Sequence, residues 1–297
     1  MVRIELQVEL NYLVDANGAD FVFNIHAAHT AHQTVSSESL WLSQALMPLV
    51  HADPSTGSRF MRLRAEPGEL KVSYQATVDL AHHVADPAQL AEVAVRHLPP
   101  EVMGYIYPSR YCQSDRLLKF ASNEFGLMWQ GHSRVQAIQA WVQRHVSFTS
   151  NTSNANTSAV DTLIEQVGVC RDFAHLMIAL CRAVNIPARF ATGTDYGADP
   201  VLGPPDFHAY VEAYLGDRWY LFDPSGTAIP MGLVRFGTGR DAADVAFATI
   251  FGGVIAGPPV IRAWAIEDTT LGLELPRLRT EALSTDPGNS GRAIRSW

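Results

Sequence analysis

A strict alternation of apolar and polar residues in the first part of the chain restricts what it can fold into. One alternating run has its apolar positions at Leu70, Val72, Tyr74, Ala76, Val78 and Leu80. A second run near the N-terminus has them at Ile4, Leu6, Val8, Leu10 and Tyr12. A period of two places one set of side chains on a single face of a β-strand. The chain is therefore expected to begin with half-buried strands.

Turn-forming residues separate these strands. Glu66-Pro67-Gly68-Glu69 lies between a strand expected over residues 60–65 and the alternating run that follows, and it predicts a hairpin between the two. Little helical periodicity occurs before residue 80. Short strands joined by turns are typical of a small β-sandwich.

Helical periodicity replaces the alternation in the second part of the chain. Asp86 followed by Pro87 is an N-cap and first-turn signal for a short helix that Pro99-Pro100 must end. Residues 170–184 are apolar almost all round, which is typical of a helix buried inside a domain. The predicted fold class is therefore α+β.

The length of the chain indicates more than one unit. A chain of 297 residues exceeds a typical single domain of roughly 100 to 200 residues. We expect a β-sandwich over residues 1–98 and a second, mixed domain over residues 99–279. Residues 280–297 are rich in small and polar side chains and are expected to form a disordered tail.

Composition argues against several classes of function. The chain has 22 Lys and Arg against 30 Asp and Glu, and no basic run is interleaved with aromatic residues, so no nucleic-acid partner is expected. No apolar run reaches the roughly 18 residues of a membrane span. Arg3 and Glu5 interrupt the N-terminal apolar residues where a signal peptide needs an unbroken run, which predicts a cytoplasmic location.

The three cysteines do not form a recognisable disulfide or zinc pattern. Cys112, Cys170 and Cys181 are too few for a disulfide framework and lack the C-x-x-C spacing of a zinc site. Each is expected to be a free thiol, and neither a metal nor another cofactor is expected. Cys112 and Cys181 are interpreted as structural residues.

Cys170 differs from the other two cysteines because it begins the predicted buried helix. The N-terminus of a helix has unpaired backbone N–H groups and the positive end of the helix dipole, and both favour a thiolate over a thiol. The same N–H groups could stabilise a developing oxyanion. Cys170 is therefore the candidate nucleophile.

A thiol nucleophile needs a base, and the sequence offers two histidines. His175 lies five residues further along the same helix, about 140° around the axis and a turn and a half deeper, so it is a poor partner for Cys170. We expect His175 to satisfy buried polar groups and to pair with Asp172. His208 is the better candidate because it begins a predicted hairpin.

The register of that hairpin predicts a partner for His208. Gly216-Asp217 matches a two-residue loop, which would pair Leu215 with Arg218. Asp223 then lies on the same face as His208 and diagonal to it, with Cβ atoms roughly 7 to 8 Å apart. Asp223 could therefore fix the tautomer of the imidazole while the other ring nitrogen faces the thiol.

Three segments resemble motifs of the bacterial transglutaminase-like superfamily. Residues 168–176, GVCRDFAHL, resemble its cysteine motif, residues 206–209, DFHA, its histidine motif, and residues 219–224, WYLFDP, its aspartate motif. They occur in the family's order, and Cys170, His208 and Asp223 take the positions of its catalytic triad. The family also has members with a β domain ahead of the catalytic core.

The resemblance implies a papain-like core and acyl-transfer chemistry. A thiolate would attack a carboxamide or peptide carbonyl, form an acyl-thioester, and pass the acyl group to water or to an amine. The expected activities are those of a cysteine protease, an amidase or an acyltransferase, with a peptide or protein amide as substrate. Animal transglutaminases require calcium, but the sequence has no EF-hand-like loop, so no metal is carried over. The oxyanion-hole side chain is not assigned.

Two alternatives remain open from the sequence. The chain could be a catalytically silent interaction module, in which the β domain binds a partner and the core is a scaffold; the intact triad argues against this. It could also be an acyltransferase that uses a thioester cofactor, as the arylamine acetyltransferases do. The extra β domain and the closer motif match disfavour that reading.

Overall fold

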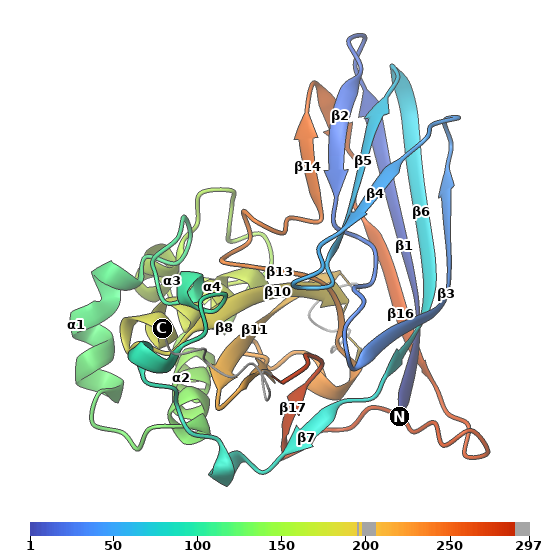
Figure 1. The fold of residues 1–297 in the computed structure, drawn as a ribbon. Coiled ribbons are helices and arrows are strands. Elements are labelled where there is room, and N and C mark those ends of the chain that lie inside the picture. The colour runs from blue at the N-terminus through green and yellow to red at the C-terminus, as the bar shows by residue number, and fades with distance from the viewer. Residues whose placement is uncertain (195, 198–205, 289–297) are drawn as a thin grey trace, which may run out of the picture.

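A computed structural model describes residues 1–194, 196–197 and 206–288. Figure 1 shows a tall β-sandwich beside a mixed region in which helices pack on a second set of strands. The fold class predicted from the sequence, α+β with an N-terminal β-sandwich, agrees with this arrangement. Among the described residues, no helix is both long enough and apolar enough to span a bilayer.

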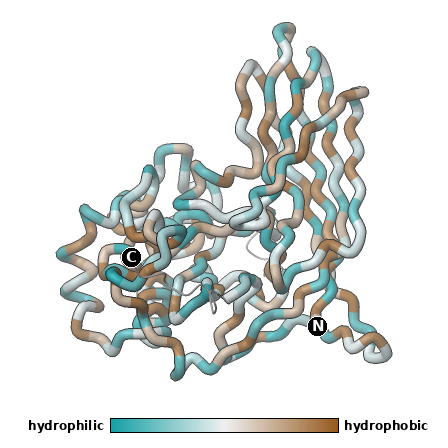
Figure 2. The backbone as a smooth tube through the Cα atoms, in the orientation of Figure 1, coloured by the Kyte–Doolittle hydropathy of each residue, from teal (hydrophilic) through white to brown (hydrophobic). Residues whose placement is uncertain are grey.

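The first sheet of the sandwich is built around the two long alternating strands. Its members are β1 (Val2–Val14), β3 (Gln33–Leu42), β6 (Gly68–Leu80), β15 (Val254–Ala256) and β16 (Val260–Ile266). The order is β15-β1-β6-β3, and β16 pairs with the other part of β1. Hydrophobic and hydrophilic residues alternate along these strands in Figure 2. Every second residue of β1 is buried, as the sequence predicts.

The second sheet faces the first across the core of the sandwich. Its order is β14-β2-β5-β4, with the bounds Ala248–Phe251, Ala19–Phe23, Arg59–Ala65 and Leu49–Ala52. The predicted hairpin across residues 66–69 is wrong. The strands on either side exist, but β5 pairs with β2 and β4 while β6 pairs with β1 and β3. The turn therefore carries the chain from one sheet to the other, which lets both strands bury their apolar faces in one core.

The described part of the second region consists of a four-stranded sheet and four α-helices. The sheet has the order β12-β11-β10-β13, with the bounds Arg218–Phe222, Phe207–Leu215, Ala188–Thr194 and Val234–Gly239. The helices are α1 (Ser114–Phe125), α2 (His132–His145), α3 (Ala159–Glu165) and α4 (Cys170–Ala183). Every residue of α4 after Arg171 is buried, so the predicted buried helix is confirmed. It packs on α1, α2, α3 and β11.

Short elements complete the fold. They are the parallel pair β8 (Ser147–Phe148) and β9 (Val167–Gly168), the antiparallel pair β7 (His83–Ala85) and β17 (Ala282–Ser284), and 3-10 turns over Pro87–Gln89, Val95–His97, Met103–Tyr105 and Pro230–Gly232. The helix expected after Asp86 is one of these 3-10 turns. Its Asp86 side chain accepts a hydrogen bond from the N–H of Ala88 at 2.9 Å, as an N-cap does.

The structure divides the chain differently from the predicted boundaries at 98 and 279. Strands β14, β15 and β16, all within residues 248–266, return to the sandwich and pair with β1 and β2. The sandwich is therefore completed by a segment that follows the second region in sequence. The sequence of this segment shows little alternation, because β14 and β16 lie at sheet edges and bury few of their side chains.

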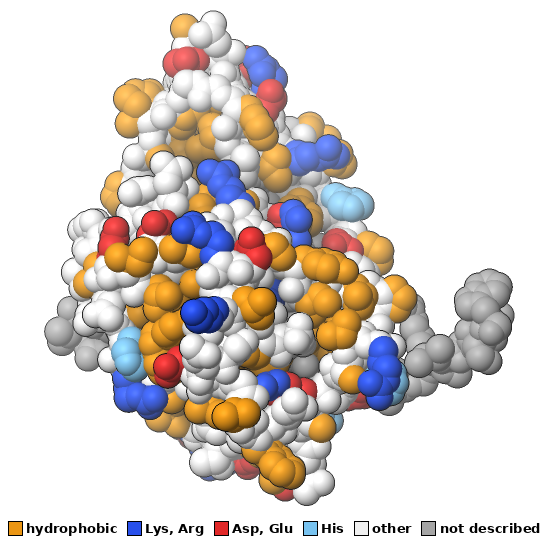
Figure 3. Space-filling model, turned by 90° about the vertical axis from the view of Figure 1, so that its left-hand side faces the viewer, with side chains coloured by type: hydrophobic (Ala, Val, Ile, Leu, Met, Phe, Trp, Pro, Cys, Tyr) orange, Lys and Arg blue, Asp and Glu red, His pale blue; other side chains and the backbone are white. Residues whose placement is uncertain are grey.

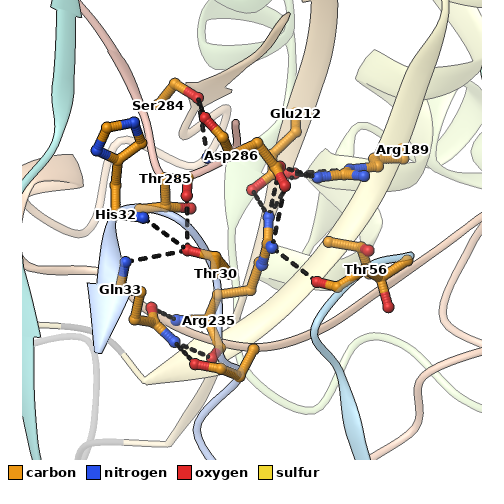
Figure 4. Close-up of polar contacts among 12 residues, drawn as sticks. Thr30, His32, Gln33, Thr56, Arg189, Glu212, Arg235, Ser284, Thr285 and Asp286 are labelled. Carbon is orange, nitrogen blue, oxygen red and sulfur yellow. Dashed lines mark hydrogen bonds and ion pairs between the residues drawn. The ribbon is translucent and has the colours of Figure 1, made fainter. Parts of the chain in front are cut away.

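The predicted disordered tail is wrong for its first part. Residues 282–284 form β17, and Thr285 and Asp286 are buried. Residues 289–297 lie outside the described residues. What holds the ordered part is an ion cluster, drawn in Figure 4, in which Arg189 and Arg235 contact Glu212 and Asp286. Small and polar residues therefore order here because one carboxylate among them neutralises buried cations.

The helical side of the molecule presents a mixed surface. Figure 3 looks onto this side and shows hydrophobic side chains interspersed with charged ones. Leu127 and Trp129, in the connection from α1 to α2, are exposed. Single exposed apolar residues are common on soluble proteins.

Loss of the Asp286 charge should destabilise the fold strongly. Asp286→Asn leaves Arg189 and Arg235 with one carboxylate in a buried site, so we expect the free energy of unfolding to fall by about 3 to 5 kcal/mol. The control is Asp20→Asn, which breaks the ion pair between Asp20 and Arg64, whose side chains are both 57% exposed. This substitution should lower the free energy of unfolding by less than about 1 kcal/mol. Urea unfolding measures both. Equal small effects would contradict the structural role of the C-terminal segment.

The contribution of Asp286 to the free energy of unfolding should also depend on pH. Burial raises the pKa of this carboxyl, but the charges of Arg189 and Arg235 outweigh burial and lower it to about 2. Because the pKa is lower in the folded state than the unfolded value of about 3.9, the stabilisation is complete above about pH 5 and is lost as the pH falls towards 2. The difference in unfolding free energy between wild type and Asp286→Asn should therefore narrow by roughly 2 to 3 kcal/mol over that range. A difference that stays constant with pH would contradict this explanation.

Candidate active site

Cys170 begins helix α4, as its sequence position predicts. The start of the helix is capped by Asp172, whose carboxylate accepts a hydrogen bond from the N–H of Val169 at 2.9 Å. This contact requires Gly168, because a Cβ there would lie 2.7 Å from the Cβ of Asp172. The predicted pair between Asp172 and His175 is therefore wrong, since Asp172 folds back over the helix start.

The thiol of Cys170 is partly exposed and faces strand β11. Its Sγ lies 3.8 Å from the carbonyl oxygen of Phe207, which can accept a weak hydrogen bond from the thiol. Phe207 directly precedes His208, so this contact holds the sulfur beside the candidate base. Cys112 and Cys181 are fully buried elsewhere in the core.

The hairpin that carries His208 has the register expected from its loop. Leu215 pairs with Arg218 and Val211 pairs with Phe222. Gly216 has a φ of 60°, a left-handed conformation that glycine adopts without strain. The prediction of the β11–β12 register is therefore confirmed, and with it the shared face of positions 208 and 223.

His208 and Asp223 meet in a buried contact. The Nε2 of His208 lies 3.2 Å from Oδ1 of Asp223, and each side chain is 2% exposed. This leaves Nδ1 as the ring nitrogen available to Cys170. The structure thus brings together the three side chains proposed from the sequence.

The loop after β12 fixes the carboxylate of Asp223. Oδ1 accepts hydrogen bonds from the backbone N–H of Ser225 at 3.1 Å and from its hydroxyl at 2.6 Å, and Oδ2 accepts one from the N–H of Ala228 at 3.0 Å. The sequence analysis did not identify Ser225 or Ala228. A signal for Ser225 was present, because Asp followed two residues later by Ser is typical of an Asx-turn.

Helix α2 holds the backbone at the same place. The side-chain amides of Gln139 and Gln143 donate to the carbonyl oxygen of Asp223 at 3.0 and 3.2 Å. The two glutamines are four residues apart, so they lie on one face of the helix. No sequence pattern connects them with Asp223, which is 80 or more residues away.

The electrostatics of the pair favour charged forms of both groups. Burial lowers the pKa of His208, but the adjacent carboxylate of Asp223 and the contact with Cys170 raise it well above the ordinary value. Burial raises the pKa of Asp223, but the imidazolium and the hydrogen bonds of the Ser225–Ala228 loop outweigh burial and lower it. The arrangement therefore stabilises the imidazolium form of His208.

His175 has no part in this arrangement. It is fully buried, its Nε2 accepts a hydrogen bond from the N–H of Ala242 at 3.2 Å, and its ring stacks on Tyr111. This fits the expectation that His175 satisfies a buried polar group. Among the described residues, no three His, Cys, Asp or Glu side chains are grouped so that they could hold a metal ion.

Comparison with known proteins places this fold and site in one family. Residues 123–224 match the Transglutaminase-like superfamily, and residues 2–101 match the Bacterial transglutaminase, N-terminal domain. A crystal structure of a candidate cysteine protease from Cytophaga hutchinsonii superimposes with a TM-score of 0.87 at 39% identity, covering 95% of this chain and 97% of that one. The fold is that of a thiol enzyme with a papain-like core. The chain belongs to the transglutaminase-like superfamily.

Curated relatives are mycobacterial and uncharacterised. A Mycobacterium leprae protein is 32% identical over 117 residues, which is 38% of this chain and 42% of that protein. A Mycobacterium tuberculosis protein is 30% identical over 110 residues, or 33% of this chain and 35% of that protein. The chain thus matches less than half the length of these relatives.

The geometry predicts that Cys170 is the reactive thiol. Burial raises the pKa of Cys112 to about 12 and raises that of Cys181, so both should resist alkylation. With iodoacetamide at about pH 6.5, Cys170 should react at least about tenfold faster than either, and His208→Ala should remove most of that advantage. Mass spectrometry of each cysteine peptide measures the rates.

Protein unfolded in urea serves as the control for this measurement, because all three thiols should then react alike. Equal rates for the three cysteines in the folded protein would contradict an activated Cys170. A fast rate that His208→Ala leaves unchanged would contradict the role of the imidazole.

Proposed function

We propose that this chain is a thiol enzyme that cleaves an amide or peptide bond through an acyl-thioester on Cys170. The observation that supports the proposal is the buried contact between His208 and Asp223 beside a thiol at the start of a helix. The similarity to a candidate cysteine protease over nearly the whole chain supports it as well. The substrate proposed is a peptide or protein amide.

In the first half-reaction the proton of the Cys170 thiol passes to Nδ1 of His208, and the resulting thiolate attacks the carbonyl carbon of the substrate. The C–S bond forms, and the negative charge on the carbonyl oxygen is stabilised by N–H groups at the N-terminus of α4. His208, protonated at Nδ1, gives its proton to the leaving nitrogen as the C–N bond breaks. The amine product leaves, and the acyl group remains on sulfur.

In the second half-reaction an acceptor attacks the thioester. His208 takes a proton from the acceptor, a new C–O or C–N bond forms, and the sulfur of Cys170 leaves as a thiolate. Water as acceptor gives hydrolysis, and a primary amine gives acyl transfer. Asp223 holds the imidazole in the orientation that both half-reactions need.

The test measures both outcomes in one reaction. Casein is incubated with the protein and monodansylcadaverine, and mass spectrometry counts new chain ends, deamidated glutamines and dansylated glutamines. We expect turnover in at least one of these products and none with Cys170→Ala. Asp223→Asn should lower kcat by about three to four orders of magnitude, because the imidazole loses its orienting carboxylate.

His51→Ala is the matched control, because His51 is exposed on strand β4 of the sandwich. It should have wild-type activity. Product formation that survives in Cys170→Ala would contradict the proposal. A wild-type protein that is alkylated rapidly at Cys170 but gives no product with casein or with a panel of small amides and thioesters would also contradict the proposal. That result would favour a catalytically silent interaction module.

A further inference from the structure

The outward face of the first sandwich sheet carries aligned rows of polar side chains. The register of β16, β1, β6 and β3 places two cross-strand rows side by side: Trp264, Glu5, Thr77 and Ser37 in one, and Arg262, Gln7, Gln75 and Ser39 in the next. All lie on the face opposite the buried residues of β1 and β6. Neighbouring strands are about 4.8 Å apart, so the rows extend roughly 14 Å across the sheet.

This face is hollowed into a groove. The groove has a volume of about 430 Å³ and is lined by both rows apart from Arg262. Trp264 borders it, and the indole Nε1–H donates a hydrogen bond to the carboxylate of Glu5 on the neighbouring strand at 2.8 Å. The indole is therefore held at the groove in advance of any ligand, while 43% of the residue remains exposed.

A second exposed tryptophan lies on the same face. Trp41 is opposite Ser73 on β6 and is 57% exposed. It follows Ser39 on β3, at the far side of the sheet from Trp264. Two large aromatic side chains left exposed on one polar sheet face are costly to solvate and are enriched where proteins bind ligands.

The groups between the tryptophans are mostly uncharged. Gln75, Ser39 and Thr77 offer amide and hydroxyl groups that both donate and accept hydrogen bonds. At the end of the sheet, Arg3 is neutralised by Asp79 at 2.6 Å. The carboxylates of Glu5 and Glu9 accept hydrogen bonds from Trp264 and Gln7, and Arg262 carries the opposite charge. Because charges of both signs lie on the face and the two carboxylates already have donors, the face suits a neutral ligand better than an anionic or cationic one.

We propose that this face binds a neutral oligosaccharide. A pyranose ring has an apolar C–H surface that packs on an indole, and its hydroxyl groups match the mixed donors and acceptors of the groove. An extended peptide, in contrast, adds to the edge of a sheet through backbone hydrogen bonds rather than crossing the outer face. The inference rests on the sandwich alone and does not depend on the proposed thiol chemistry.

Affinity gel electrophoresis tests the proposal with the full chain. Native gels are cast with hydroxyethyl cellulose, soluble xylan or glycol chitin, and heparin gels serve as the anionic comparison. We expect at least one neutral polymer to retard the protein, and Trp264→Ala and Gln75→Ala to weaken that binding by about tenfold. Trp129→Ala is the matched control, because Trp129 is 87% exposed outside the sandwich, and it should bind as wild type does.

A folding defect is separated from a binding defect by two further readouts. Trp264→Phe keeps an aromatic ring without the indole N–H and should retain part of the affinity, and the alkylation rate of Cys170 should be unchanged in every variant. Retardation by no neutral polymer would overturn the proposal, as would retardation by heparin alone. An equal loss of binding in Trp129→Ala and Trp264→Ala would overturn it too.

Discussion

The guanidinium of Arg235 is fully buried, and the need to neutralise it sets a condition that the rest of the structure must meet. A buried cation is tolerated only when it is paired and hydrogen-bonded. Glu212 of β11 and Asp286 of the C-terminal segment provide the negative charge. The guanidinium also donates a hydrogen bond to the carbonyl oxygen of Thr56, which belongs to the sandwich, at 2.9 Å. Figure 4 shows these groups converging from separate segments. Sandwich, core sheet and C-terminal segment are thereby held in one arrangement.

Strand β11 connects this cluster to the candidate active site. Glu212 and His208 lie four residues apart on the same strand and therefore point to the same side of the sheet. One end of the strand is anchored by the ion cluster, and the other presents the imidazole to Asp223 and Cys170. The pair of His208 and Asp223 gains rigidity from β12 on one side and from helix α2, through its two glutamine amides, on the other. Such support keeps a reacting constellation in its productive geometry.

The parts of the site that could be predicted from the sequence are those determined by residues close together along the chain. The loop Gly216-Asp217 selects the hairpin register, so the relation between His208 and Asp223 follows from counting residues. The start of an apolar helix at Cys170 likewise follows from the periodicity of one segment. The capping contact of Asp172 was missed, because its carboxylate had two partners within reach and only the folded turn selects the N–H of Val169.

The sequence by itself determined the two long alternating strands, the residue at which the buried helix begins and the shared face of His208 and Asp223. These are properties of short segments, set by side-chain period, turn residues and the spacing along one hairpin. Only the tertiary structure decided that residues 66–69 cross between sheets, that residues 248–266 complete the sandwich, and that residues 282–286 are ordered. Each of these depends on a contact between segments distant in sequence. Such a contact stabilises the fold only after the partner segment has been brought into position.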